Sequence, residues 1–295
     1  MKRDRLDDRM ERLRGFSLRE WTARTLGANF LPIRDPVRDR RAVDARHGVE
    51  VTWIGHATIL VDLPGFRFIT DPFLTRRVVI PRRLVHPGRS PEELQDLNAV
   101  LVTHAHMDHL DIPSHRLLPR NAVLVTPPKV SRYLRRIGYR AVHELGWWET
   151  VTLGDGVEVT AVPAKHWGTR GLLPDGNGYG GYVVRHRDFC WYFAGDTAYF
   201  DGFHEIGRRF SIDLACLPIG AYHPPSFREV HMNPEDAYRA FIDLGAAHLL
   251  PVHFETLVLS MEPIGEPRDR IEALRGSNGH SDRVHVLSPG MSLGF

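Results

Sequence analysis

The chain has 295 residues, of which 42% are hydrophobic and 25% are charged, and its formal net charge is +2. This composition excludes a disordered chain, because enough apolar material is present to form a core, and the net charge gives no argument for nucleic-acid binding. Seventeen histidines against two cysteines exclude a disulfide scaffold and a cysteine-type zinc finger. Any metal site must therefore use imidazole and carboxylate ligands.

Residues 1–46 are predicted to be a basic, amphipathic extension. Apolar residues recur among its arginines at roughly helical spacing, at Leu6, Met10, Leu13 and Trp21. The segment has no apolar stretch typical of a secretory signal, and the chain has no run of 18 apolar residues, which favours a cytoplasmic protein. Two interpretations stay open for the extension: it packs on the main domain or a second subunit, or it lies on anionic lipid at the inner face of the membrane.

Residues 47–295 are predicted to form one α/β domain. Short apolar runs separated by turns indicate strands at 49–63, 66–74, 98–106, 122–128, 157–166, 181–186, 189–197, 213–222 and 248–254. Helices are expected at 117–138 together with strand residues, at 233–246 with Asn233 as N-cap, and at 268–276. Cys190 and Cys216 lie in apolar runs and are expected to be reduced core residues. Mixed strands and helices indicate a layered α/β architecture.

The segment THAHMDH carries the strongest signal. It places His104, His106, Asp108 and His109 directly after an apolar strand. In an extended chain His104 and His106 point to the same side, and a tight turn can bring Asp108 and His109 back to that point. Three imidazoles and a carboxylate have little structural use at a strand end, but they are ligands that suit a divalent ion such as zinc. We therefore predict a metal site here.

Three later strands also end on polar residues, namely His166, Asp196 and His253. Taken singly, a histidine or aspartate in such a position is usually an ordinary core, surface or turn residue. Their order after the first cluster marks them as further candidate ligands.

This order, HxHxDH followed by a single His, an Asp in a Gly-Asp dipeptide and a last His, resembles that of the metallo-β-lactamase fold hydrolases. The resemblance implies a four-layer αββα sandwich with the site at one edge of the two sheets. It also implies two divalent ions, with zinc expected and iron or manganese as alternatives. One ion would take His104, His106 and His166, the second would take Asp108, His109 and His253, and Asp196 would bridge them.

Motifs across residues 49–295, among them TWIGHAT, ITDPF, ELGWWE and FAGDTAYF, are similar to the branch of N-acyl-phosphatidylethanolamine-hydrolysing phospholipases D. This similarity implies hydrolysis of a phosphodiester by a hydroxide held between the metals, with His231 assisting at the substrate phosphate. Val230 stands where that branch carries Gln, and Phe254-Glu255 stand where it carries Trp-Gly. Both differences lie near the expected site and leave the lipid substrate open.

The expected catalytic residues are Asp108, Asp196 and His231, acting on a small-molecule or lipid phosphodiester. Sugar-phosphate lactonases share the TWxGHAT opening and the ligands, so a lactone or other carboxylic ester of a phosphorylated metabolite is the alternative substrate. A di-iron redox protein is disfavoured, because such members typically carry Glu at the position of His106. A nuclease is disfavoured because 295 residues leave no room for the domain that nucleases usually add.

Other residues carry weaker expectations. His223 is expected to line the entrance of the site and Arg228 to contact a substrate anion. His56 is expected to have a structural role, bonding a loop of the site or the backbone. Asp111 is either the acceptor for an imidazole N–H or a turn residue. The segment 72–83 interleaves apolar residues with four arginines, which suits a lipid interface, a lid over the site or a homodimer contact.

Overall fold

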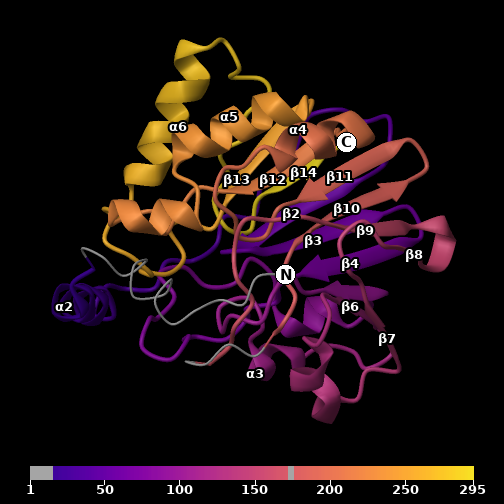
Figure 1. The fold of residues 1–295 in the computed structure, drawn as a ribbon, viewed down its shortest axis with the longest axis horizontal. Helices are drawn as coiled ribbons and strands as arrows, with labels where there is room; N and C mark the ends of the chain where they lie inside the picture. The colour runs from indigo at the N-terminus through magenta and orange to yellow at the C-terminus, as the bar shows by residue number, and fades with distance from the viewer. Residues whose placement is uncertain (1–15, 172–175) are drawn as a thin grey trace.

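Two β-sheets form the centre of the molecule, in a computed structural model that describes residues 16–171 and 176–295 (Figure 1). The expectations for Leu6, Met10 and Leu13 fall outside these residues. The first sheet has the order β1 (Arg40–Ala42), β14 (Ser292–Gly294), β2 (Glu50–Gly55), β3 (Thr58–Leu63), β4 (Phe66–Thr70), β5 (Ala99–Leu101), β6 (Val123–Thr126) and β7 (Ala141–Glu144). The second has the order β13 (His248–Val252), β12 (Leu214–Pro218), β11 (Phe189–Phe193), β10 (Gly181–His186), β9 (Glu158–Val162) and β8 (Thr150–Thr152).

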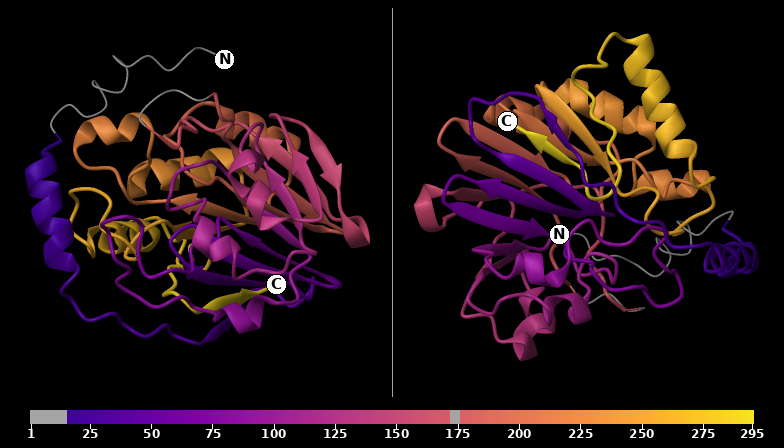
Figure 2. Two further views of the ribbon diagram at one scale, coloured as in Figure 1. Left: turned by 90° about the horizontal axis from the view of Figure 1, so that it is seen from below. Right: turned by 180° about the vertical axis from the view of Figure 1, so that it is seen from behind.

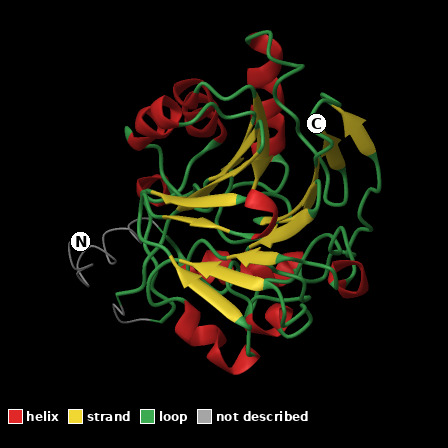
Figure 3. Cartoon of the chain, turned by 90° about the vertical axis from the view of Figure 1, so that its right-hand side faces the viewer, coloured by secondary structure: helices red, strands yellow, loops and turns green. Residues whose placement is uncertain are grey.

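Helices cover the outer faces of both sheets (Figure 3). On the second sheet lie α4 (Gly202–Arg209) and α5 (Pro234–Leu244), and α6 (Glu266–Ser277) packs on α5. On the first sheet lie α3 (Ile112–His115) and the 3-10 helix η2 (Ser131–Ile137). Three further 3-10 helices are η1 (Pro91–Leu94), η3 (Gly154–Gly156) and η4 (Pro225–Glu229). The order of layers is helix, sheet, sheet, helix.

The inner faces of the two sheets form the main core. Trp53, Phe68, Trp191 and Phe193 are all buried there. The rings of Trp191 and Phe193 stack with centroids 5.7 Å apart, and Phe68 meets Trp191 edge to face at 5.4 Å. Full burial of such a side chain contributes about 1.5–3 kcal/mol, so this contact holds the two sheets together and fixes their relative position at the site.

The strand predicted over residues 49–63 is wrong in one respect, because it is two strands, β2 and β3, joined by a turn at His56-Ala57. Gly55 and His56 both have positive φ, 125° and 56°, and the indole Nε1 of Trp53 donates to the carbonyl of His56 at 2.8 Å. The turn is buried together with the strands it joins. Hydrophobicity therefore continues through it and does not reveal the break.

Helix α5 shows how local sequence sets an element that lies next to the site. The side chain of Asn233 accepts a hydrogen bond from the backbone N–H of Asp236 at 2.8 Å, Pro234 occupies the first turn, and Gly245 ends the helix with φ 62°. These residues are an N-cap, a proline suited to the first turn and a C-terminal glycine. The helix thus begins three residues after His231, at a position fixed by its own sequence.

The N-terminal segment packs against the sandwich. Helix α2 (Leu18–Ala28) lies beside the loop that follows β13 (Figure 2, left). Trp21 Nε1 donates to the carbonyl of Leu259 at 3.0 Å, and Arg24 Nη1 donates to that of Met261 at 2.7 Å. Further on, β1 adds a parallel strand to β14. Among the described residues, no helix combines the length and apolarity that crossing a bilayer requires.

Candidate metal centre

The predicted ligands meet at one edge of the sandwich, where strands of both sheets that run in the same direction end. Strand β5 leads to the segment 103–109, β9 leads to His166, β11 leads to Asp196 and β13 leads to His253. The carboxyl ends of parallel strands gather at one edge of a sheet. The face-to-face packing of the two sheets then brings both sets of strand ends together.

His104, His106 and His166 form the first ligand group. His104 Nε2 lies 2.9 Å from His106 Nδ1, and His166 Nε2 lies 3.2 Å from the same atom. Ligand nitrogens on a tetrahedral zinc, at Zn–N distances of about 2.0–2.1 Å, are about 3.3 Å apart. The three nitrogens are therefore spaced as one face of a coordination shell.

Asp108, His109 and His253 form the second ligand group, together with His56. Asp108 Oδ2 lies 3.5 Å from His109 Nε2 and 3.7 Å from His253 Nε2. His56 Nε2 lies 3.0 Å from the same oxygen. Burial, followed by the neighbouring His253, lowers the pKa of His56 to about 3, so its neutral ring can donate to Asp108. His56 thus contacts a candidate ligand in a loop of the site, one of the two kinds of partner expected for it.

Asp196 stands between the two groups. Its Oδ2 is 3.1 Å from His109 Nε2 in the second group and 3.9 Å from both His104 Nε2 and His166 Nε2 in the first. Its Oδ1 is 3.3 Å from His253 Nε2. One carboxylate therefore faces imidazoles of both groups, as a bridging ligand must.

A buried carboxylate that the sequence analysis did not single out, Asp71, supports the ligands from behind. Its Oδ2 lies 2.8 Å from His109 Nδ1 and accepts from Thr103 Oγ1 at 2.6 Å. The same hydroxyl oxygen lies 3.0 Å from His104 Nδ1. His166 Nδ1 faces the carbonyl of Val230 at 2.9 Å. Bonds at Nδ1 leave Nε2 of each ring directed at the site. The ITDPF motif was the signal for Asp71, since it places an aspartate directly after β4.

Asp111 serves a turn and does not accept from a ligand. It is the N-cap of α3, where its side chain accepts from the backbone and hydroxyl of Ser114, and it accepts from Thr75 Oγ1 at 2.8 Å. Of the two roles expected for Asp111, the structure shows the turn role, and Asp71 is the acceptor for the imidazole.

The centre contains buried polar atoms without a hydrogen-bond partner in the described chain. They are His109 Nε2, His253 Nδ1 and Nε2, Asp196 Oδ1 and His231 Nδ1. Leaving such atoms unpaired costs about 1–3 kcal/mol each. Except for His253 Nδ1, these atoms face the space between the two groups. Divalent cations with nitrogen and oxygen ligands fit this arrangement, because they would satisfy these atoms together.

The pKa shifts of the buried histidines and aspartates also favour a bound cation at this centre. Burial lowers the pKa of His109, but the Asp196 and Asp108 carboxylates outweigh it and hold that pKa well above its usual range. Burial raises the pKa of Asp196, but the His109 charge outweighs it and holds that pKa well below its usual value. Burial also lowers the pKa of His104 and of His166, so both rings are neutral. Positive charge is therefore favoured beside the carboxylates, and neutral imidazoles are the form that binds metal.

The three residues expected to contact substrate are not all placed at the centre. His231 lies at the centre, because its Nδ1 is 3.8 Å from Asp196 Oδ2. Burial lowers the pKa of its ring to about 4. Arg228 lies outside the cluster and pairs with Asp236 at 3.5 Å. His223 is exposed, and its backbone N–H bonds to Glu262 at 3.2 Å. No described contact joins His223 to a ligand.

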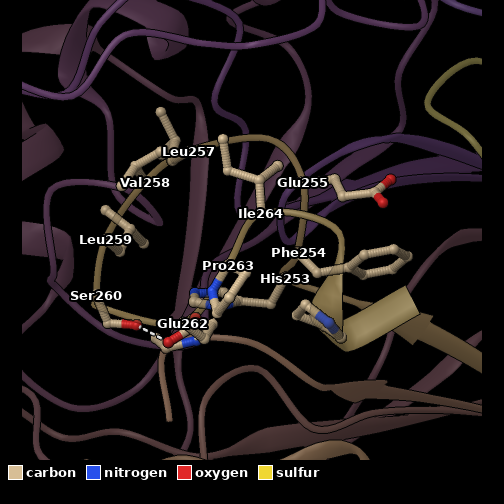
Figure 4. Close-up of a pocket in the computed structure, with 12 residues that line it drawn as sticks. His253, Phe254, Glu255, Leu257, Val258, Leu259, Ser260, Glu262, Pro263 and Ile264 are labelled. Carbon is tan, nitrogen blue, oxygen red and sulfur yellow. Dashed lines mark hydrogen bonds between the residues drawn. The ribbon is translucent and has the colours of Figure 1, made fainter. Parts of the chain in front are cut away.

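The loop after β13 carries His253 and lines a small cavity with its apolar side chains (Figure 4). Glu262 closes this loop, since its carboxylate accepts from Ser260 Oγ and from the backbone N–H of Ala221 at 2.7 Å. The loop is therefore tied to the chain that follows β12, and α2 packs on its outer side. This double attachment fixes the position of His253.

A sequence model of the β-lactamase superfamily domain matches residues 66–254, the part of the chain that carries all seven predicted ligands. The chain belongs to this superfamily. The metallo-β-lactamase resemblance and the αββα fold predicted from the sequence are therefore confirmed, and the protein is a metal-dependent hydrolase by family.

Other members are similar along most of this chain. It is 36% identical to an uncharacterized protein of Mycobacterium tuberculosis over 76% of its own length, and it spans 63% of that relative. It is 34% identical to the N-acyl-phosphatidylethanolamine-hydrolyzing phospholipase D 1 of Caenorhabditis elegans, with 81% of this chain and 74% of that enzyme covered. Among solved structures, an isothiocyanate hydrolase from Delia radicum gut bacteria matches with a TM-score of 0.69 at 23% identity, covering 83% of this chain and 98% of its own.

Proposed function

We propose that this protein is a phosphodiesterase of the N-acyl-phosphatidylethanolamine phospholipase D type. It would hydrolyse a lipid phosphodiester to a phosphomonoester and an alcohol. The sequence support is the 34% identity to the Caenorhabditis elegans enzyme of that name. The observation that carries the proposal beyond the family is an apolar groove whose wall is hydrogen-bonded to segments that carry candidate ligands.

The groove has a volume of about 650 Å³ and is lined by Pro128, Lys129, Trp147, Tyr179 and nearby glycines. Trp147 is 45% exposed, although a side chain of its size is usually well buried. Its ring meets that of Tyr179 edge to face at 5.7 Å. Aromatic walls with one cation suit a chain of methylenes attached to an anionic group.

The wall of the groove is joined to the ligand segments. Gly180 N donates to the carbonyl of Thr103 at 3.2 Å, next to His104. Asn177 Nδ2 donates to the carbonyl of Gly168 at 2.9 Å, two residues after His166. These bonds connect the wall to the first ligand group, and we propose that an acyl chain in the groove directs its polar end towards that group.

The proposed site would bind two divalent cations, with zinc as the expected metal, through the seven candidate ligands, with Asp196 shared between them. Such ions lower the pKa of water and neutralise charge on phosphate oxygens. Because its pKa is about 4, the His231 ring is neutral at pH 7, and its N–H would donate a hydrogen bond to a phosphate oxygen. Asp71 and Thr103 hold the rings of His109 and His104 in the ligating orientation. Arg228 would contact an anionic part of the substrate farther out.

We also propose that the protein meets a lipid surface through the tip of the segment 72–83. The base of this segment cannot contact lipid, because Phe73 and Arg83 are both buried and Arg83 donates to the carbonyl of Phe73. At the tip Val79 is 73% exposed, two residues after the exposed Arg77. Asn29, at the end of α2, donates to the carbonyl of Ile80 at 3.1 Å, and the next residue, Phe30, is 88% exposed. Apolar side chains beside arginines suit an anionic interface. Sedimentation with anionic vesicles tests this, and an absence of salt-sensitive binding would contradict it.

A substrate panel on the metal-loaded protein tests the function. It contains an N-acyl-phosphatidylethanolamine in mixed micelles, bis(p-nitrophenyl) phosphate and a sugar-phosphate lactone. Both diesters should be hydrolysed. Trp147→Ala should raise KM for the long-chain lipid about tenfold and leave the short diester unchanged, because only the former fills the groove. His231→Ala should keep its metal and lose about 10²-fold or more in kcat. Hydrolysis of the lactone alone would overturn the proposal.

A further inference from the structure

Arg170 lies four residues after His166 and reaches across to the HxHxDH segment. Its Nη1 donates to the carbonyl of Ala105 at 2.9 Å and to that of Leu110 at 2.8 Å. Both acceptor residues are fully buried. One guanidinium thus joins two ligand-bearing segments that lie far apart in the sequence.

The two carbonyls mark the beginning and the end of the ligand turn. Ala105 stands between His104 and His106, and Leu110 directly follows His109. Inside this interval the backbone N–H of Leu110 donates to the carbonyl of His106 at 2.8 Å, which closes one helical turn. Arg170 therefore bonds both ends of the turn that presents Asp108 and His109, and it determines how wide that turn can open.

Arg170 is itself held in place. Its guanidinium carbon lies 5.5 Å from the centroid of the Tyr133 ring. The backbone that carries it packs tightly, because a Cβ on Gly168 would come within 2.5 Å of the carbonyl oxygen of Gly178. The segment 166–170 thus has little freedom to move, and the arginine can transmit that rigidity to the ligand turn.

We infer that Arg170 is a positioning residue of the metal centre, which clamps the turn 105–110 onto the segment that carries His166. The inference rests on the proposed metal binding by these ligands and is independent of the substrate. A planar guanidinium with several N–H donors suits two carbonyls from one position, whereas a lysine ammonium is a point donor on a flexible stem. Loss of the clamp should loosen the spacing of both ligand groups.

Arg120 provides a matched control. It also donates to two backbone carbonyls, those of His115 and Arg116 at 3.3 and 3.2 Å, but these lie at the end of α3 and hold no candidate ligand. Arg170→Met and Arg120→Met remove the same kind of contact. Zinc affinity is measured for both by competition with a chromophoric chelator, together with the melting temperature of the metal-free proteins.

We expect Arg170→Met to weaken zinc binding about 10–100-fold, the usual loss when a partner outside the direct ligands is removed. Arg170→Lys should recover part of the lost zinc affinity, and the zinc affinity of Arg120→Met should stay within about threefold of the parent's. If Arg170→Met does not fold, the absorption spectrum of the cobalt-loaded Arg170→Lys protein reports the coordination directly and should differ from the parent's. Unchanged affinity and spectrum, or an equal loss in Arg120→Met, would overturn the inference. Full metal retention in His104→Ala would instead overturn the ligand assignment.

Discussion

The two ligand groups are supported by different chemistry. In the first, His104 reaches the buried Asp71 only through the hydroxyl of Thr103, and His166 relies on a backbone carbonyl. In the second, His109 contacts the Asp71 carboxylate directly. The first group is therefore oriented by neutral acceptors and the second by charge. Rings of both groups are connected to Asp71, which is not itself a candidate ligand. This one carboxylate therefore helps to orient histidines in both halves of the centre.

The largest effect is expected where the two groups share a ligand. Asp196→Ala removes a carboxylate whose Oδ2 lies 3.9 Å from His104 Nε2 in the first group and 3.1 Å from His109 Nε2 in the second. Bound metal, measured by elemental analysis, and activity should fall together, and by more than the roughly 10–100-fold cost of losing an outer partner. Asp201→Ala, at an exposed aspartate in front of α4, is the control. Full metal content in Asp196→Ala would show that the groups do not share this residue.

Asp71→Asn should have the next largest effect, because it disturbs both groups at once. The amide keeps the size of the side chain but turns one acceptor into a donor. A donor at the place of Oδ2 opposes the bonds at His109 Nδ1 and Thr103 Oγ1, and one at the place of Oδ1 opposes the bond from the backbone N–H of Thr103. Zinc affinity should fall about 10–100-fold. Competition titration checks this, and unchanged affinity would mean that the rings are oriented without the carboxylate.

Thr103→Val should affect the first group only. Valine has nearly the same shape but lacks the hydroxyl between His104 and Asp71, while the backbone N–H of residue 103 still bonds to Asp71 at 2.7 Å. We expect a loss of about tenfold or less in affinity for one metal equivalent and little change for the other. Equal weakening of both equivalents would contradict the division into two groups.

The smallest effect is expected from the N-terminal helix, which supports the second group from outside. Arg24→Met removes bonds to the carbonyls of Met261 and Glu262 in the loop that carries His253. The free energy of unfolding should fall by about 1–2 kcal/mol, with metal affinity nearly unchanged. Arg19→Met, at an exposed position of the same helix, is the control in a urea titration. An equal loss of unfolding free energy in Arg19→Met would show that the Arg24 hydrogen bonds do not stabilise the loop.

Sequence reasoning located the seven candidate ligands because their signal is local. HxHxDH lies within six residues, and the other three residues each end an apolar strand. Sequence reasoning did not find the turn at His56-Ala57, because the strands on both sides of it are buried and the sequence stays apolar through the turn. Asp71 and Arg170 escaped it as well. The ITDPF motif marks the position of Asp71 after a strand, but an aspartate before proline and an arginine in a loop are common. Their neighbours in sequence do not show which distant groups they will contact.

The sequence by itself therefore determined the ligand types, the strands that end on them and the family to which the chain belongs. Only the tertiary structure decided which ligands face one another and what holds their rings. The packing of two sheets brings Asp71, His104, His166, Asp196 and His253 from five strand ends to one edge. The reason is physical, because strand and ligand signals depend on residues close in sequence, whereas ring orientation depends on hydrogen-bond partners supplied by distant segments.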